Sequence, residues 1–222
     1  CISGSLFFSI SFTMNLAKYI DYTLLKATAT PADIEKLCQE ARQYGFFSVC
    51  VNSSYVPLAA QLLKGTDVKV CTVVGFPLGA MSTQGKLYET STALAEGADE
   101  IDMVINLGLF LSGRTAKVLD EIALLKQETA DKVLKVIIET CYLNDDQKRL
   151  ASQICVDAGA DFVKTSTGFG TGGATLADVQ LIKEVVGDRA KIKASGGIRN
   201  RETALQYIDL GVSRIGASAI LI

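Results

Sequence analysis

Short runs of apolar and β-branched residues alternate with amphipathic segments along the chain from residue 14 onward. The short runs are apolar at consecutive positions, which is typical of strands that are covered on both faces of a parallel sheet. We predict eight such strands, at residues 19–23, 47–52, 68–75, 100–106, 133–140, 161–166, 191–195 and 213–218.

The segments between these runs carry helix start and stop signals. In TPADIEKLCQEARQYG, Thr30 is placed to cap a helix, Pro31 occupies its first position and Gly45 closes it. The segments that begin at Thr175 and Asn200 follow the same pattern. Eight strands that alternate with helices over about 200 residues predict an α/β fold, a single-domain (β/α)8 TIM barrel. A doubly wound open sheet is the alternative, but no Gly-x-Gly-x-x-Gly motif follows the first strand.

The two ends of the chain differ from its middle. Residues 1–13, CISGSLFFSISFT, have no basic residue before their apolar run and no small-residue cleavage site after it, unlike a signal peptide. Because Met14 resembles an ordinary start, we expect residues 1–13 to be a leader or an added segment and residues 14–222 to form the barrel domain. The chain stops soon after the eighth predicted strand, so we expect the last helix of the barrel to be missing or truncated.

Composition narrows the range of functions. The formal net charge is -2, and nucleic-acid-binding proteins are typically basic, so the charge does not indicate binding to nucleic acid. No apolar run approaches the roughly 20 residues of a membrane span. The 6 cysteines show no Cys-x-x-Cys spacing, which indicates reduced thiols and a cytoplasmic protein. The chain contains no histidine, the commonest metal ligand and general base. We therefore expect no metal and no cofactor, and most zinc enzymes and histidine-dependent hydrolases are disfavoured.

Two lysines stand near the ends of neighbouring predicted strands, where TIM barrels carry their reacting groups. They are Lys164 in DFVKTS and Lys193 in KIKAS. If both point inward, burial and the two like charges lower the pKa of such amines, and an amine without its proton can form a Schiff base. Asp102, on the fourth predicted strand, could relay protons beside them. The plainer alternatives are surface lysines and a structural carboxylate.

Small residues and glycines follow the sixth, seventh and eighth predicted strands. Glycine lets backbone amides approach a ligand closely, and the last two loops of TIM barrels frequently bind phosphate. We predict a phosphate site here, although any one glycine pair could be a tight turn. The candidate residues are Thr167, Gly168, Gly196, Gly197, Gly216 and Ser218.

Five segments together resemble the 2-deoxyribose-5-phosphate aldolases: VKTSTGFGTGGAT, IKASGGIR, EIDMVINLG, VGFPLGA and IDYTLLK. The resemblance extends from residue 14 to residue 218. It implies a class I aldolase that reversibly cleaves 2-deoxy-D-ribose 5-phosphate to acetaldehyde and D-glyceraldehyde 3-phosphate through a lysine Schiff base. Its partners would be these sugar-phosphate and aldehyde substrates, with no nucleic acid and no membrane. A homodimer is an expectation for this family that no residue pattern here indicates.

Matching the motifs residue by residue gives the roles that the resemblance implies. Lys164 would form the Schiff base, Lys193 would be the second lysine that tunes it, and Asp102 would be the acid/base partner. Asp21 and Thr23 would hydrogen-bond the sugar or support the lysines. The phosphate would be held by Gly196, Gly197, Gly216 and Ser218.

Two positions depart from the family pattern. Tyr22 stands where the family usually has histidine, and strand alternation predicts that its side chain points away from the pocket. Ile220 stands where a glycine usually continues the phosphate motif, so we expect a weaker phosphate grip. Cys50 is expected to be a small buried residue, with a reactive thiol at the pocket as the alternative.

Three other functions remain open from the sequence. Another Schiff-base barrel, such as a transaldolase, shares the lysine chemistry. A metal-dependent aldolase or epimerase shares the fold but would normally need histidine. An inactive barrel that binds sugar phosphates would keep the glycine loops and lose turnover.

Overall fold

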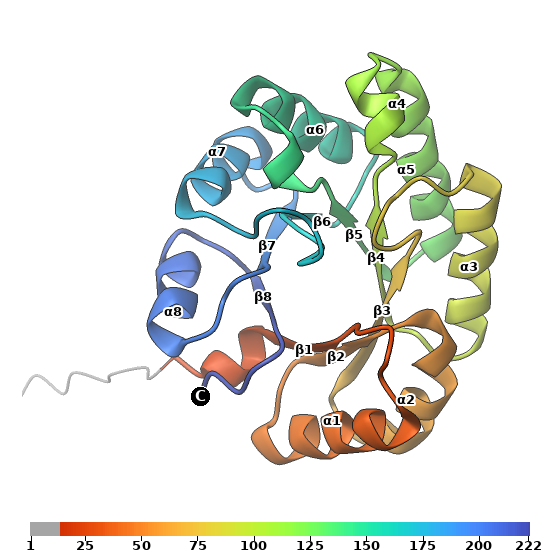
Figure 1. The fold of residues 1–222 in the computed structure, drawn as a ribbon, viewed down its shortest axis with the longest axis vertical. Coiled ribbons are helices and arrows are strands. Elements are labelled where there is room, and N and C mark those ends of the chain that lie inside the picture. The colour runs from red at the N-terminus through yellow and green to blue at the C-terminus, as the bar shows by residue number, and fades with distance from the viewer. Residues whose placement is uncertain (1–13) are drawn as a thin grey trace, which may run out of the picture.

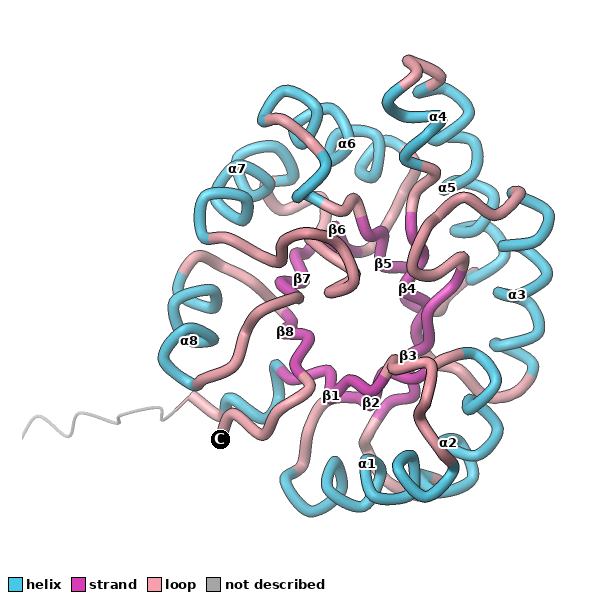
Figure 2. Tube along the Cα trace, in the orientation of Figure 1, coloured by secondary structure: helices cyan, strands magenta, loops and turns pink. Residues whose placement is uncertain are grey.

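Eight parallel strands close into a barrel in chain order, and β8 pairs with β1. Our computed structural model describes residues 14–222, so the leader expected at residues 1–13 lies outside the described part. The strands form an inner ring and the helices surround it (Figures 1 and 2). The predicted α/β TIM barrel is confirmed.

Every predicted strand overlaps an observed one, and most of the predicted ends are too long by one to three residues. The strands are β1 Ile20–Leu24, β2 Ser48–Val51, β3 Lys69–Val74, β4 Glu100–Val104, β5 Val133–Ile137, β6 Phe162–Lys164, β7 Lys191–Ser195 and β8 Arg214–Ala217.

The three helices with predicted start signals begin directly after those residues, Thr30, Thr175 and Asn200. Thr30 caps the first one by accepting a hydrogen bond from the Asp33 amide, and Gly45 ends it in the left-handed conformation. The helices are α1 Pro31–Tyr44, α2 Val56–Leu63, α3 Thr83–Ala95, α4 Leu107–Leu111, α5 Thr115–Thr129, α6 Asp145–Asp157, α7 Leu176–Val186 and α8 Arg201–Asp209. Three short 3-10 turns are η1 Leu16–Tyr19, η2 Ser53–Tyr55 and η3 Thr140–Tyr142.

No helix follows β8 within residues 14–222, as expected from the sequence. Helices α4 and α5 both lie between β4 and β5. Among the described helices, none has the length and apolar character that a membrane span requires.

The outward-facing and inward-facing side chains of the strands differ in polarity. Residues that face outward, such as Val49 and Val163, are fully buried against the helices in one large apolar cluster. Residues that alternate with them face the barrel interior, and several of these are buried charged side chains. The register of each parallel strand pair determines which of these charged side chains lie next to each other.

Candidate active site

Strand register brings the predicted lysines side by side in the barrel interior. Lys164 on β6 and Lys193 on β7 are register partners, so their side chains leave the sheet on the same face. Asp102 on β4 pairs in the same way with Lys135 on β5, and Lys193 pairs with Arg214 on β8. All five side chains are buried.

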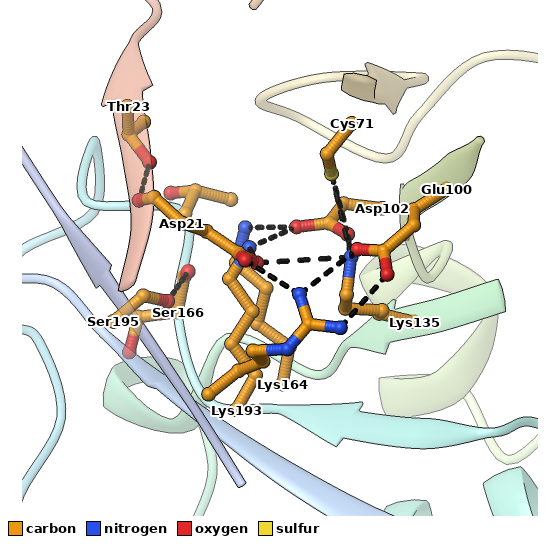
Figure 3. Close-up of polar contacts among 12 residues, drawn as sticks. Asp21, Thr23, Cys71, Glu100, Asp102, Lys135, Lys164, Ser166, Lys193 and Ser195 are labelled. Carbon is orange, nitrogen blue, oxygen red and sulfur yellow. Dashed lines mark hydrogen bonds and ion pairs between the residues drawn. The ribbon is translucent and has the colours of Figure 1, made fainter. Parts of the chain in front are cut away.

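Asp102 is the centre of this interior network (Figure 3). Its Oδ2 atom accepts hydrogen bonds from Lys164 Nζ at 2.7 Å and Lys193 Nζ at 2.8 Å. Its Oδ1 atom accepts from Lys135 Nζ at 2.8 Å and from the Cys71 thiol at 3.2 Å. The structure therefore brings together the three residues for which the sequence predicts catalytic roles.

Asp21 contacts the cations of the interior network. Its carboxylate is fully buried and contacts Lys193 Nζ at 2.5 Å and Arg214 Nη1 at 2.6 Å. Ser48 donates a further hydrogen bond to it at 2.7 Å. Of the two roles predicted for Asp21, these contacts fit the network role, and its assignment as a sugar-binding residue stays a prediction.

Three residues of the network were missed by sequence reasoning: Glu100, Lys135 and Arg214. Glu100 contacts Lys135 Nζ at 2.6 Å and Arg214 Nη2 at 2.8 Å. A signal was present, because Glu100 lies two positions before Asp102, and Arg214 lies two positions before Gly216. Polar residues at every second position of an apolar strand indicate a charged interior, which a search of strand ends alone does not find.

The network holds one more positive than negative group. Its four cations are Lys135, Lys164, Lys193 and Arg214, and its three carboxylates are Asp21, Glu100 and Asp102. Among the described residues, Lys164 forms an ion pair with one carboxylate, whereas each of the other three cations pairs with two or more. Lys164 is thus the cation with the fewest compensating contacts.

The carboxylates decide the charge state of Lys193. Burial alone would lower the pKa of this amine, but Asp102 and Asp21 outweigh burial and raise it well above its usual range. The prediction that the two lysines lower each other's pKa is therefore wrong for Lys193. Burial would likewise raise the pKa of Asp102, yet Lys135 and the two lysines beside Oδ2 hold it well below its usual range. At neutral pH, Lys193 is a cation and Asp102 is an anion.

A cavity of about 300 Å³ opens above Lys164. Every predicted substrate residue except Asp21 borders it: Thr23, Thr167, Gly168, Gly196, Gly197, Gly216 and Ser218. Asp102 and Lys193 lie beneath this cavity and are absent from its lining. A larger cavity of about 480 Å³ lies between α6 and α7, but none of the predicted site residues borders it.

The loops around the cavity hold one another in place. The Ala174 amide donates to the Ser195 carbonyl at 3.0 Å, and a side chain at Gly173 would clash with the Gly196 carbonyl. The loop between β6 and α7 therefore requires glycine where it meets the loop after β7. In Figure 2 the β6–α7 loop curves over the edge of the ring of strands near β6.

Glu139 fixes the position of Thr167 at the edge of the cavity. Its carboxylate is 2% exposed and accepts hydrogen bonds from the Thr167 hydroxyl and, at 3.2 Å, from the Thr167 amide. The Glu139 backbone adopts the left-handed conformation, with φ of 53°, which is uncommon for a residue other than glycine. Sequence reasoning missed this support because it joins loops that are distant along the chain.

Eight residues that border the cavity were not predicted as site residues, and three of them are charged or aromatic: Lys26, Phe169 and Arg199. Lys26 and Arg199 are exposed and add positive charge beside the glycine loops. Phe169 is 54% exposed, and its ring makes an edge-to-face contact with Phe76 at 5.3 Å between centroids. Lys26 and Arg199 stand within the family-like segments IDYTLLK and IKASGGIR, which was the available signal.

The two departures from the family pattern lie outside the cavity lining. Tyr22 points outward, where its hydroxyl donates to Glu40 at 2.7 Å and its ring packs 5.0 Å from that of Phe46. This confirms the predicted orientation. Ile220 is exposed and does not border the cavity, so its effect on phosphate affinity stays a prediction.

Comparison with known proteins finds one family across nearly the whole described chain. The model of the DeoC/LacD family of aldolases matches residues 15–221. The deoxyribose-phosphate aldolase of Carboxydothermus hydrogenoformans is 57% identical over 92% of this chain and 91% of its own. That of Coprothermobacter proteolyticus is 59% identical over 93% of this chain and 94% of its own. A deoxyribose phosphate aldolase of Aeropyrum pernix, described as tetrameric, superposes with a TM-score of 0.84 at 36% identity, over 91% of this chain and 86% of its own.

Proposed function

The chain belongs to the DeoC/LacD family of aldolases, and from this membership we propose that it is a deoxyribose-phosphate aldolase whose Schiff base forms on Lys164. The observation that carries the proposal is the position of Lys164. Its side chain borders the cavity and is the interior cation with the fewest carboxylate contacts. Of the four cations, it is the only one that both borders the cavity and contacts a single carboxylate among the described residues.

The reaction begins when the neutral Lys164 amine attacks the carbonyl carbon of acetaldehyde. Loss of water gives an iminium ion, and loss of a proton from its methyl group gives an enamine. The enamine carbon then attacks the carbonyl carbon of D-glyceraldehyde 3-phosphate and forms the new carbon–carbon bond. Hydrolysis releases 2-deoxyribose 5-phosphate and restores the amine, and cleavage runs through the same steps in reverse.

Asp102 and Lys193 orient this amine and stabilise its charge states. The Oδ2 atom of Asp102 accepts from both lysines, so the carboxylate holds the positively charged form of the Lys164 nitrogen at a fixed place. Lys193 stays protonated and supplies a lasting positive charge beside this carboxylate. We assign Asp102 the relay of protons between Lys164 and water in the cavity.

The neighbouring loops supply a site for the phosphate group. Gly196, Gly197, Gly216 and Ser218 border the same cavity as Lys164. Lys26 and Arg199 stand beside these loops and offset the charge of a dianion. We also propose that phosphate binds more weakly here than in relatives that have glycine at the position of Ile220.

The other functions lose support. Relatives with 57–59% identity over more than nine tenths of this chain are deoxyribose-phosphate aldolases, which does not favour an inactive barrel or a transaldolase. A metal-dependent aldolase would fail in a chelator, whereas the Schiff-base mechanism would not.

Substrate cleavage by the purified chain tests the proposal directly. We expect release of acetaldehyde from 2-deoxyribose 5-phosphate, measured with a coupled alcohol dehydrogenase, to proceed unchanged in EDTA. The unphosphorylated sugar should be cleaved at least about tenfold less efficiently, because it lacks the charged hydrogen bonds to the loops. Equal efficiency with both sugars would contradict the phosphate site, and loss of activity in EDTA would contradict the Schiff-base mechanism.

The assembly and the location of the chain are also part of the proposal. We propose a homodimer in the cytoplasm. The tetrameric relative from Aeropyrum pernix supports self-association, and the five described cysteines are all free, which supports a reducing compartment. Light scattering of the purified chain should give twice the mass of one chain, and a monomeric mass would contradict the dimer.

A further inference from the structure

Two cysteines face each other in the barrel interior, directly beside Asp102. Cys50 on β2 and Cys71 on β3 are register partners, and both are fully buried. The Cys71 thiol donates to Asp102 Oδ1 at 3.2 Å. The two Sγ atoms and one carboxylate oxygen of Asp102 all lie within 4.8 Å of one another.

This grouping has the chemistry and nearly the spacing of a metal site. Two thiolates and one carboxylate suit a thiophilic divalent cation, and catalytic zinc sites likewise use three protein ligands and one water. Ligand atoms in a tetrahedral zinc site lie roughly 3.5–3.8 Å apart, which these side chains reach with small adjustments. We propose that Cys50, Cys71 and Asp102 bind a thiophilic divalent cation such as Zn²⁺ or Cd²⁺.

The surrounding ammonium groups do not prevent this binding. One dication replaces two thiol protons, according to M²⁺ + 2 R–SH → M(S–R)₂ + 2 H⁺. The two thiolates cancel the charge of the metal, so the interior keeps its single excess positive charge. Lys135 Nζ lies 3.4 Å from Cys71 Sγ and stabilises the thiolate form further.

Apolar side chains surround the two cysteines. Leu25, Val73 and Phe76 pack against the two cysteines. Leu25 also borders the cavity above Lys164, so the ion enters from that end of the barrel.

Binding has a consequence for turnover, and this consequence rests on the proposed function. A metal that takes a carboxylate oxygen of Asp102 weakens the hold of this carboxylate on Lys164 and Lys193. A bound ion therefore inhibits the aldolase, and a chelator restores it. The binding itself does not depend on which reaction the enzyme catalyses.

Cadmium titration of the whole chain tests the site. The starting protein carries Cys1→Ser and Cys141→Ser, because Cys141 is partly exposed and Cys1 lies outside the described residues. We expect one Cd²⁺ per chain, a sulfur-to-cadmium charge-transfer band in the ultraviolet, and release of about two protons for each ion bound. Losing a residue that only orients a metal ligand costs up to about 100-fold in affinity. Cys71→Ala removes a ligand itself, so it should weaken binding by at least about 100-fold. Turnover by the starting protein should fall as the band appears and return with EDTA.

Cys155→Ala is the matched control, because this thiol is equally buried but lies on α6 outside the barrel. It should leave the cadmium affinity unchanged. Cys71→Ser keeps the size of the side chain and replaces the alanine variant if that one fails to fold by near-ultraviolet circular dichroism. Absence of the band, or an affinity that neither Cys71→Ser nor Cys50→Ser changes, would overturn the site whether or not the enzyme is active.

Discussion

Two groups of buried charges in this molecule differ in their balance. Outside the barrel, Lys86 on α3 contacts Glu121 on α5 at 2.6 Å, and both side chains are almost fully buried. Lys86 also donates to the Val104 carbonyl at 2.7 Å. Inside the barrel, four cations share three carboxylates, and one of the cations borders a cavity.

The difference shows that burial alone does not set the state of a lysine. Burial lowers the pKa of Lys86, and its one carboxylate partner only partly offsets this effect. Burial also acts on Lys193, but two carboxylates reverse the effect and raise its pKa. The pair outside the barrel is balanced and enclosed, whereas in the interior network Lys164 contacts a single carboxylate and borders a cavity.

Replacing Lys164, the proposed nucleophile, should have the largest effect. Lys164→Leu removes the nucleophile, so we expect kcat for cleavage of 2-deoxyribose 5-phosphate to fall by about 10⁴-fold or more, while the fold is retained. Steady-state kinetics and circular dichroism measure the two quantities. A residual rate within tenfold of the parent would mean that another residue is the nucleophile.

Breaking the balanced pair should reduce stability and spare activity. Lys86→Met leaves Glu121 as an uncompensated buried charge, which typically costs about 3–5 kcal/mol in the free energy of unfolding. Urea denaturation measures this loss, and kcat at a temperature where the variant is folded should stay within about threefold. Lys86→Met/Glu121→Leu removes both charges and should recover most of the stability. A double variant that is no more stable than the single one would show that the pair itself stabilises the fold.

Neutralising Asp102, which contacts three lysines of the interior network, should have the third-largest effect, a loss of turnover. Asp102→Asn keeps the shape of the side chain and removes the charge that orients both lysines. We expect kcat to fall by about 10²-fold, within the range of general acid–base catalysis. Glu40→Gln, outside the barrel, is the control and should keep the parental kcat. Parental turnover in Asp102→Asn would exclude Asp102 from the proton relay.

The acid dependence of stability should show the smallest effect. The pKa values of Asp21 and Asp102 are lowered in the folded state, because neighbouring cations outweigh burial. Both carboxylates therefore contribute full stability above the unfolded-state pKa of about 3.9, and this contribution is lost as pH falls through their lower folded-state pKa values. Urea midpoints between about pH 5 and about pH 2 should fall more steeply for the parent than for Asp102→Asn. Parallel curves would contradict the lowered pKa of Asp102.

Much of this fold could be predicted from the sequence because its signals are local. The apolar runs located all eight strands, and Thr30 and Gly45 marked the ends of the first helix. The proximity of Lys164 and Lys193 could also be predicted, because the two residues lie on consecutive strands.

The charge states could not be predicted, because they depend on partners from strands that are distant in the sequence. The pKa of Lys193 is raised by Asp21 on β1 and Asp102 on β4, and no local pattern joins these positions. The support of Thr167 by Glu139 has the same origin, since it depends on how two loops pack. Local patterns thus identify the candidate site residues, and the register of the closed barrel determines which charged groups surround them.

Borohydride trapping with acetaldehyde tests most directly the claim that Lys164 is the reactive amine. Reduction should leave an ethyl group on the peptide that contains Lys164, as identified by mass spectrometry, and Lys164→Leu should abolish this product. Lys193 should stay unmodified, because its two carboxylate partners keep it protonated. Trapping on Lys193, or slow and scattered labelling of surface lysines with Lys164 unmodified, would contradict the account.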